Sequence, residues 1–233
     1  MYSFDSRVRY SEVDSKGQMK LESILDYFQD CSTFHSEDIG LGIAFLPVHN
    51  LVWMISAWQI VVERYPVFGE KIRIATFPYD FKGFLGSRNF FLEDSNGIKV
   101  AYANSIWTLM DTKAGRPARL LPEMIKGYVL EPRLNMMYAP RKIQMPELSI
   151  EKEPIEIREH HLDTNNHVNN GQYLRMVMDY VEKGMQIREM RAEYKKSALL
   201  GDVLIPRVAK ESDKYTISLC GKEKEIYTIV ELS

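Results

Sequence analysis

The strongest constraint on the fold of this chain is an internal repeat. Residues 9–27 (RYSEVDSKGQMKLESILDY) align with residues 158–176 (REHHLDTNNHVNNGQYLRM), so that Asp14 falls on Asp163. Both stretches read as an extended lead-in, a polar turn and the start of a helix, and several β-rich runs follow each of them. The same order of elements in both halves predicts two copies of one supersecondary unit.

Each copy is predicted to be a helix packed on an antiparallel sheet. In both halves the helix precedes the strands, and Gly69-Glu70 and Gly201-Asp202 open corresponding strands. Asn96-Gly97 between two apolar runs is a strong hairpin signal, which favours antiparallel neighbours. Because no strand–helix–strand crossover is present, a parallel sheet is disfavoured. The expected fold class is therefore α+β.

The spacing of apolar residues predicts the individual helices and strands. In the first half, the expected elements are a helix from Leu21 to about Gly40, strands at Leu51–Glu63, Glu70–Tyr79, Arg88–Glu93 and Lys99–Met110, and a short helix at Leu120–Tyr128. In the second half, they are an extended segment at Ile155–Leu162, a polar turn at Asp163–Asn170, a helix ending near Gly184, and strands at Ile187–Tyr194, Val203–Ala209, Tyr215–Leu219 and Glu225–Leu232.

A proline-rich segment separates the two halves. Residues 129–154 contain Pro132, Pro140, Pro146 and Pro154 without a sustained hydrophobic period. Prolines at this density favour an extended connection over a helix or a central strand. We therefore expect an N-terminal domain at 1–131, a linker at 132–153 and a C-terminal domain at 154–233.

Charge and cysteine content exclude several classes of function. The formal net charge is −2, so the chain lacks the basic field of a nucleic-acid-binding protein. Cys31 and Cys220 form no Cys-x-x-Cys pair, so the chain has no zinc or thioredoxin signature, and buried thiols in a reducing compartment are expected. The first residues contain no apolar signal sequence, and no run of 18 apolar residues occurs. We expect a cytoplasmic protein without a membrane span, a metal or a cofactor.

One polar stretch, His160 to Asn170, contains the residue types that perform hydrolytic chemistry. If its backbone is extended, the side chains of Asp163, Asn165 and His167 point to one side. A histidine can act as a general base, an aspartate can orient it, and an amide can stabilise an oxyanion. The helix that follows, capped by Asn169 or Asn170, would favour negative charge at its N-terminus. The alternative is that this stretch is only a turn and a helix cap.

The same stretch resembles a known family. Its sequence Leu-Asp-Thr-Asn-Asn-His-Val-Asn-Asn-Gly-x-Tyr is similar to the Asp-x-Asn-x-His-Val-Asn-Asn-x-x-Tyr signature of acyl-acyl-carrier-protein thioesterases, the bacterial and plant fatty acyl-ACP enzymes. Other parts of the chain match the pattern of that family in the same order, namely residues 8–14, 58–73, 106–111, 115–119 and 193–196.

The resemblance implies a fold, an activity and a site. The fold would be a tandem (double) hotdog, in which each unit is a long helix packed on an antiparallel sheet. The activity would be hydrolysis of the thioester of acyl-acyl carrier protein, which ends fatty acid elongation and releases a free fatty acid. Asp163, Asn165 and His167 would be the catalytic residues, with Asn169 and Asn170 in the oxyanion region. The first half would hold the acyl chain, and acyl carrier protein would be the partner that carries the substrate.

The chain departs from the family pattern at one position. Plant members have Glu-Cys directly after Glu-Tyr-Arg-Arg, and that glutamate is assigned a catalytic role, whereas this chain has Ser197-Ala198 there. Ser197 or Glu193 is therefore the candidate for a supporting role. The chain also lacks a plant-type transit peptide, so a bacterial-type enzyme is the closer resemblance.

Other interpretations remain open from the sequence. A coenzyme A thioesterase of the same fold, a hotdog dehydratase and a non-catalytic acyl-binding module would share most of these features. Five aromatic residues and one methionine of the first half fit either an acyl pocket or a plain core, and these are Trp53, Met54, Trp58, Phe81, Phe84 and Phe90. A homodimer is an additional candidate assembly.

Overall fold

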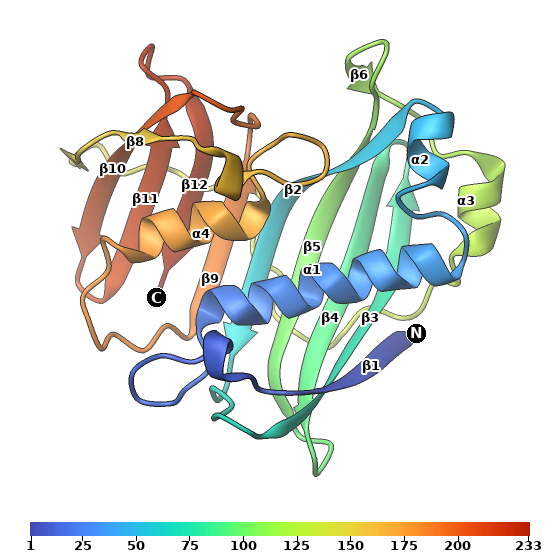
Figure 1. Ribbon diagram of the computed structural model, residues 1–233, viewed down its shortest axis with the longest axis horizontal. Coiled ribbons are helices and arrows are strands. Elements are labelled where there is room, and N and C mark those ends of the chain that lie inside the picture. Colours follow the sequence, from blue (N-terminus) through green and yellow to red (C-terminus); the bar gives the residue numbers. More distant parts are fainter. The chain divides into compact units, whose positions relative to one another are not determined.

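A computed structural model describes all 233 residues (Figure 1). The chain divides into two compact units, the first made of residues 1–56 and 60–138, the second of residues 57–59 and 139–233. The chain therefore passes from the first unit to the second inside the proline-rich segment. No helix in the structure is both long enough and apolar enough to cross a membrane.

Unit 1 is an antiparallel sheet with one long helix across it (Figure 1). Its strand order is β1-β3-β4-β5-β2, and the short strand β6 pairs with β5. The strands of this unit are β1 (Tyr2–Arg7), β2 (Leu51–Val62), β3 (Lys71–Lys82), β4 (Leu85–Asp94), β5 (Lys99–Asp111) and β6 (Arg116–Pro117). Its helices are the 3₁₀ turn η1 (Tyr10–Glu12), α1 (Leu21–Asp38), α2 (Phe45–Val48) and α3 (Pro122–Gly127).

Helix α1 forms because its apolar residues recur every three or four positions. Leu21, Ile24, Leu25, Phe28 and Cys31 are all buried, and the ring of Phe28 lies 5.4 Å from that of Phe90 on β4. The helix ends just before Gly40, whose φ of +73° is the left-handed conformation that suits a helix C-terminus. The predicted helix at Leu21 is thus confirmed, and so is the Asn-Gly hairpin between β4 and β5.

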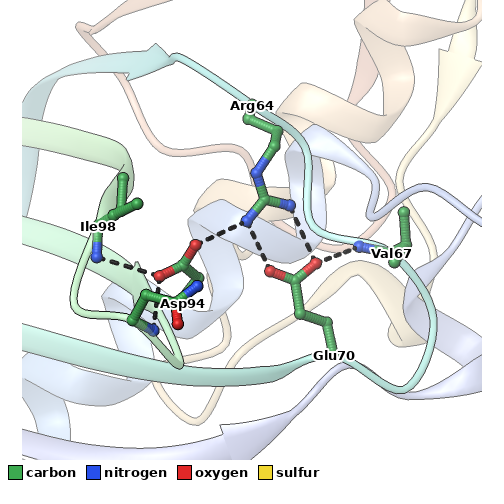
Figure 2. Close-up of polar contacts among 6 residues, drawn as sticks. Arg64, Val67, Glu70, Asp94 and Ile98 are labelled. Atoms are coloured by element: carbon green, nitrogen blue, oxygen red, sulfur yellow. Dashed lines mark hydrogen bonds and ion pairs between the residues drawn. The ribbon is translucent and has the colours of Figure 1, made fainter.

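A cluster of charged residues links neighbouring strands at one end of the unit 1 sheet (Figure 2). Arg64, just after β2, donates to both carboxylate oxygens of Glu70 at 3.0 and 2.7 Å and to Asp94 at 3.3 Å. Glu70 also accepts the N–H of Val67, and Asp94 accepts the N–H of Ile98. The cluster joins the end of β2, the start of β3 and the β4–β5 turn. The guanidinium lowers the pKa of Glu70.

Unit 2 repeats this plan on a smaller scale (Figure 1). Its strand order is β9-β12-β11-β10-β7, and β8 also pairs with β10. The elements are β7 (Ile150–Glu151), β8 (Ile155–Glu156), the 3₁₀ turn η2 (Glu159–His161), α4 (Asn170–Met178), β9 (Glu189–Tyr194), β10 (Val203–Glu211), β11 (Lys214–Cys220) and β12 (Ile226–Leu232). Each unit is thus a helix on an antiparallel sheet, which confirms the α+β prediction.

Two local predictions in the second half were wrong. Only Ile155–Glu156 of the expected extended segment is a strand, because residues 159–161 tighten into η2. Helix α4 ends at Met178 instead of near Gly184. Beyond Met178, the N–H groups of Tyr180 and Val181 bond to carbonyls three residues earlier, so the chain forms tight turns instead of helix.

Candidate functional site

Asp163, Asn165 and His167 lie together in one tight turn. The Oδ1 atom of Asp163 accepts the N–H groups of Asn165 at 2.8 Å and His167 at 3.3 Å, and the Asp163 N–H donates to the His167 carbonyl at 2.8 Å. Asn166 has a φ of +58° and bonds back to the Asp163 carbonyl. The supposed extended backbone is therefore wrong, because the aspartate side chain folds the segment back on itself.

The corresponding turn of unit 1 has the same construction. The Oδ1 atom of Asp14 accepts the N–H groups of Lys16 at 2.8 Å and Gln18 at 2.9 Å, and Asp14 N–H donates to the Gln18 carbonyl. Gly17, with a φ of +75°, takes the place of Asn166. The two copies thus share the aspartate that closes the turn, and they differ at the positions of Asn165 and His167.

The imidazole of His167 makes no hydrogen bond to the rest of the chain. The residue is half-buried, and its ring has no hydrogen-bond partner anywhere in the described chain; only its main-chain groups take part in the turn. Asn165 is exposed on the same turn. A histidine held by its backbone with a free ring nitrogen can accept a proton from a water molecule.

Helix α4 begins directly after this turn. The side chain of Asn169 accepts the N–H of Gly171 at 2.9 Å, which confirms Asn169 as the predicted cap. The main-chain N–H of Asn169 bonds to the His161 carbonyl at 2.9 Å, and the Asn170 carbonyl accepts the hydroxyl of Tyr194 at 3.4 Å. The start of the helix is therefore fixed beside the turn, with its dipole favouring negative charge there.

The segment after β9 is bonded to the same turn. Val168, the residue after His167, donates its N–H to the carbonyl of Ala198 at 3.0 Å. Ser197 is therefore next to the residue that pairs with Val168, and its side chain is half-buried without a hydrogen-bond partner. The structure brings Ser197 to the candidate site.

Glu193 is on the other face of the sheet. In β9, side chains alternate, and Tyr194 faces the helix, where its ring lies 5.8 Å from that of Tyr173. The buried carboxylate of Glu193 accepts the N–H of Ile143, and Lys195 lies 3.9 Å away. Glu193 thus anchors the connecting segment, and the structure does not bring it to the turn.

The aromatic residues proposed for an acyl pocket separate into different environments. Trp53 and Phe81 stack at 6.5 Å and pack against a buried cluster made of Leu41, Leu51, Leu109, Met124 and Tyr128. Phe90 is in the core under α1, Phe84 is exposed, and Trp58 belongs to unit 2. Of this set, Trp53 and Phe81 are the two that share an apolar cluster.

A buried cation next to this cluster was not anticipated from the sequence. Arg88 on β4 is only 7% exposed, and its guanidinium contacts His35 Nδ1 at 3.0 Å, Thr76 and the face of Tyr128. Burial and the neighbouring guanidinium lower the pKa of His35 to about 4. His35 is therefore neutral at pH 7 and can accept the Arg88 hydrogen bond. Because the two residues lie 53 positions apart, no local pattern signals the pair.

The fold is shared with a known class of proteins. Two units, each a helix on an antiparallel sheet, form the hotdog-type fold of solved thioesterases. An acyl-ACP thioesterase from Bacteroides thetaiotaomicron superposes with a TM-score of 0.89 at 22% identity, covering 99% of this chain and 96% of that one. The 12:0-ACP thioesterase of Umbellularia californica superposes with a TM-score of 0.86 at 18% identity, with coverage of 99% and 96%.

Sequence profiles identify the family. The profile described as acyl-ACP thioesterase N-terminal domain matches residues 1–128, and the one described as acyl-ACP thioesterase C-terminal domain matches residues 146–227. The chain belongs to the acyl-ACP thioesterase family. A chloroplastic palmitoyl-acyl carrier protein thioesterase of Arabidopsis thaliana is 23% identical over an alignment of 215 residues that covers 84% of this chain and 52% of that protein. The chain spans about half the length of the curated relatives it matches.

Proposed function

We propose that this protein hydrolyses the thioester of fatty acyl chains carried on acyl carrier protein. The observation that carries the proposal is the turn of unit 2. It shares its scaffold with the turn of unit 1 and differs where chemistry needs an imidazole, with His167 in place of Gln18. The family profiles, which match both halves of the chain, support the same reaction.

In the proposed reaction, His167 takes a proton from a water molecule as the water oxygen adds to the thioester carbonyl carbon. The N-terminus of α4 and the amide of Asn165 stabilise the oxyanion. The C–S bond then breaks, its electron pair leaves on sulfur, and His167 returns the proton to the thiolate. The products are a free fatty acid and the thiol of the carrier protein.

Asp163 and Ser197 have supporting roles in this scheme. One carboxylate oxygen of Asp163 closes the turn, and the charge of that carboxylate stabilises the imidazolium that forms on His167. Ser197 supplies a hydroxyl at the position where plant members have glutamate. We further propose that unit 1 holds the acyl chain against the apolar cluster that includes Trp53 and Phe81.

The two cysteines indicate where the protein is located. Both cysteines are buried and unpaired, as in proteins of a reducing compartment. We therefore propose a cytoplasmic enzyme.

A matched pair of substitutions tests the function. His167→Ala should lower turnover of acyl carrier protein thioesters about a hundredfold or more, because a general base is lost. Gln18→Ala, at the equivalent position of unit 1, should leave turnover within about twofold, since no chemistry is assigned there. Near-normal turnover in His167→Ala would contradict the assignment. Assays with the matching coenzyme A thioesters, in low and high salt, separate a carrier-protein enzyme from a coenzyme A enzyme.

A further inference from the structure

Tyr173 on α4 holds the segment that carries Ser197. Its side chain is 2% exposed, and its hydroxyl oxygen accepts the N–H of Ala198 at 2.8 Å. The carbonyl of Ala198 in turn accepts the N–H of Val168 at 3.0 Å. Ala198 is thus bonded on one side to the helix and on the other side to the turn that bears His167.

Unit 1 shows which of these bonds the fold itself requires. The bond from Val168 to Ala198 has an equivalent there, in which Met19 donates to the carbonyl of Pro66 at 2.7 Å. The bond from the Ala198 N–H to the Tyr173 hydroxyl has no equivalent in unit 1, because Pro66 has no N–H group. In the alignment of the two repeats, Tyr173 corresponds to Ile24, which has no hydroxyl and is fully buried.

The apolar pair of unit 1 and the hydrogen-bonded pair of unit 2 therefore occupy the same place. Since unit 1 folds with isoleucine and proline, the hydroxyl of Tyr173 is not a requirement of this architecture. Burying a hydroxyl has a cost that its hydrogen bond only offsets. A polar pair present in the copy that carries His167, and absent from the other, indicates a role in the site.

The segment after β9 has few other hydrogen bonds near Ala198. Lys195 and Lys196 bond to the carbonyl of Tyr227, and Leu199 bonds to the carboxylate of Asp202. Between these contacts, the Ala198 N–H is the group that joins the segment to α4. Burial raises the pKa of Tyr173 to about 12, so its hydroxyl stays neutral at physiological pH.

We propose that Tyr173 is a positioning residue of the hydrolytic site: its bond to Ala198 holds Ser197 in register with the turn that carries His167. This inference rests on the proposed thioester hydrolysis. Tyr173 does not itself exchange protons with the substrate. It acts through the backbone of Ala198, so its loss should affect the rate of the chemical step more than the binding of the acyl chain.

The first test is Tyr173→Phe, which removes one oxygen and keeps the ring. We expect kcat to fall about 10- to 100-fold while KM stays within about twofold. The pH at which kcat/KM is half-maximal should not move, since Tyr173 does not titrate in the working range. Tyr27→Phe is the matched control, because the hydroxyl of this buried α1 tyrosine bonds to Ser6 and Glu12 in unit 1. It should leave both kinetic constants unchanged.

The second test transfers the pair of unit 1 into unit 2. Ala198→Pro removes the donor, and Tyr173→Ile/Ala198→Pro recreates the apolar pair, which unit 1 shows to be compatible with this fold. Tyr173→Phe and Ala198→Pro remove the same hydrogen bond. The fold-decrease in kcat of the double variant Tyr173→Phe/Ala198→Pro should therefore equal the larger of the two single fold-decreases, and not the product of the two. Circular dichroism and urea unfolding report whether each variant is folded.

The outcomes separate the two proposals. If the wild-type protein releases no fatty acid from any thioester, the proposed function fails and the positioning role falls with it. If the wild type is active and Tyr173→Phe keeps kcat within twofold, the function stands and the positioning role is overturned. Multiplicative losses in the double variant would also overturn it, because the two residues would then act independently.

Discussion

Replacing Asp163 by alanine removes two hydrogen bonds from the turn that carries His167. The carboxylate accepts the N–H groups of Asn165 and His167 at 2.8 and 3.3 Å. Bonds of this kind, partly open to solvent, contribute about 0.5–1.5 kcal/mol each, so the free energy of unfolding should fall by about 1–3 kcal/mol. Asp14→Ala removes the same two bonds from unit 1 and should cost about as much.

The two alanine variants should differ in activity. Urea unfolding gives the stability of each, and release of free acid from acyl carrier protein thioesters gives the turnover. Asp163→Ala should lose most of its turnover, whereas Asp14→Ala should keep it within about twofold despite the equal loss of stability. Asp163→Asn retains an oxygen acceptor and removes the charge, so we expect near-normal stability with turnover reduced about tenfold or more.

Two results would refute this reasoning. Asp163→Ala with wild-type stability would show that the carboxylate does not hold the turn. Equal losses of turnover in Asp14→Ala and Asp163→Ala would show that the effect is one of stability, and that unit 2 is not specialised for chemistry.

Three further predictions concern stability. Lys224, with a φ of +65°, occupies the turn position that Gly97 holds in unit 1 with a φ of +75°, so Lys224→Gly should stabilise the protein by about 1 kcal/mol in urea unfolding. The lowered pKa of His35 means that the unfolded chain binds this proton more tightly, so stability falls as the pH drops below 6.5 and the loss levels off below about 4. At pH 5 this loss is at most about 2 kcal/mol, and it should disappear in His35→Asn, measured by urea unfolding from pH 7.5 to pH 5. Arg64→Met should cost less than about 1 kcal/mol at pH 7, because the ion pair with Glu70 is partly exposed. The difference should shrink as the pH falls below 4.5 and vanish only below the lowered pKa values of Glu70 and Asp94, where both carboxylates are protonated.

The parts of the fold that follow from the sequence are those with local causes. The apolar spacing from Leu21 to Cys31 is sufficient to predict α1. Asn96-Gly97 predicts the β4–β5 turn because glycine tolerates the positive φ found there. The internal repeat predicts the architecture of both units, because the same order of helix and strands packs in the same way in each.

The parts that could not be predicted depend on contacts between distant residues or on competing local bonds. The sequence predicts a polar turn at Asp163–Asn170, but side-chain alternation takes no account of an aspartate that closes the turn by bonding to its own backbone. Tyr173 and Ala198 are 25 positions apart, and Tyr173 stands in a helical stripe that is otherwise aliphatic. That tyrosine is the one feature of the sequence that indicates the bond to Ala198. Glu193 was considered for the site because strand alternation relates it to Ser197, but the chain leaves β9 at Tyr194, before Ser197 is reached.

The most direct test of the account is the release of free fatty acid from acyl carrier protein loaded with chains of graded length. We predict catalytic release by the wild-type protein, faster from the carrier protein than from matching coenzyme A thioesters, and loss of that release in His167→Ala. Release from none of the acyl carrier protein thioesters, or equal release by His167→Ala, would contradict the central claim that the turn of unit 2 hydrolyses a thioester.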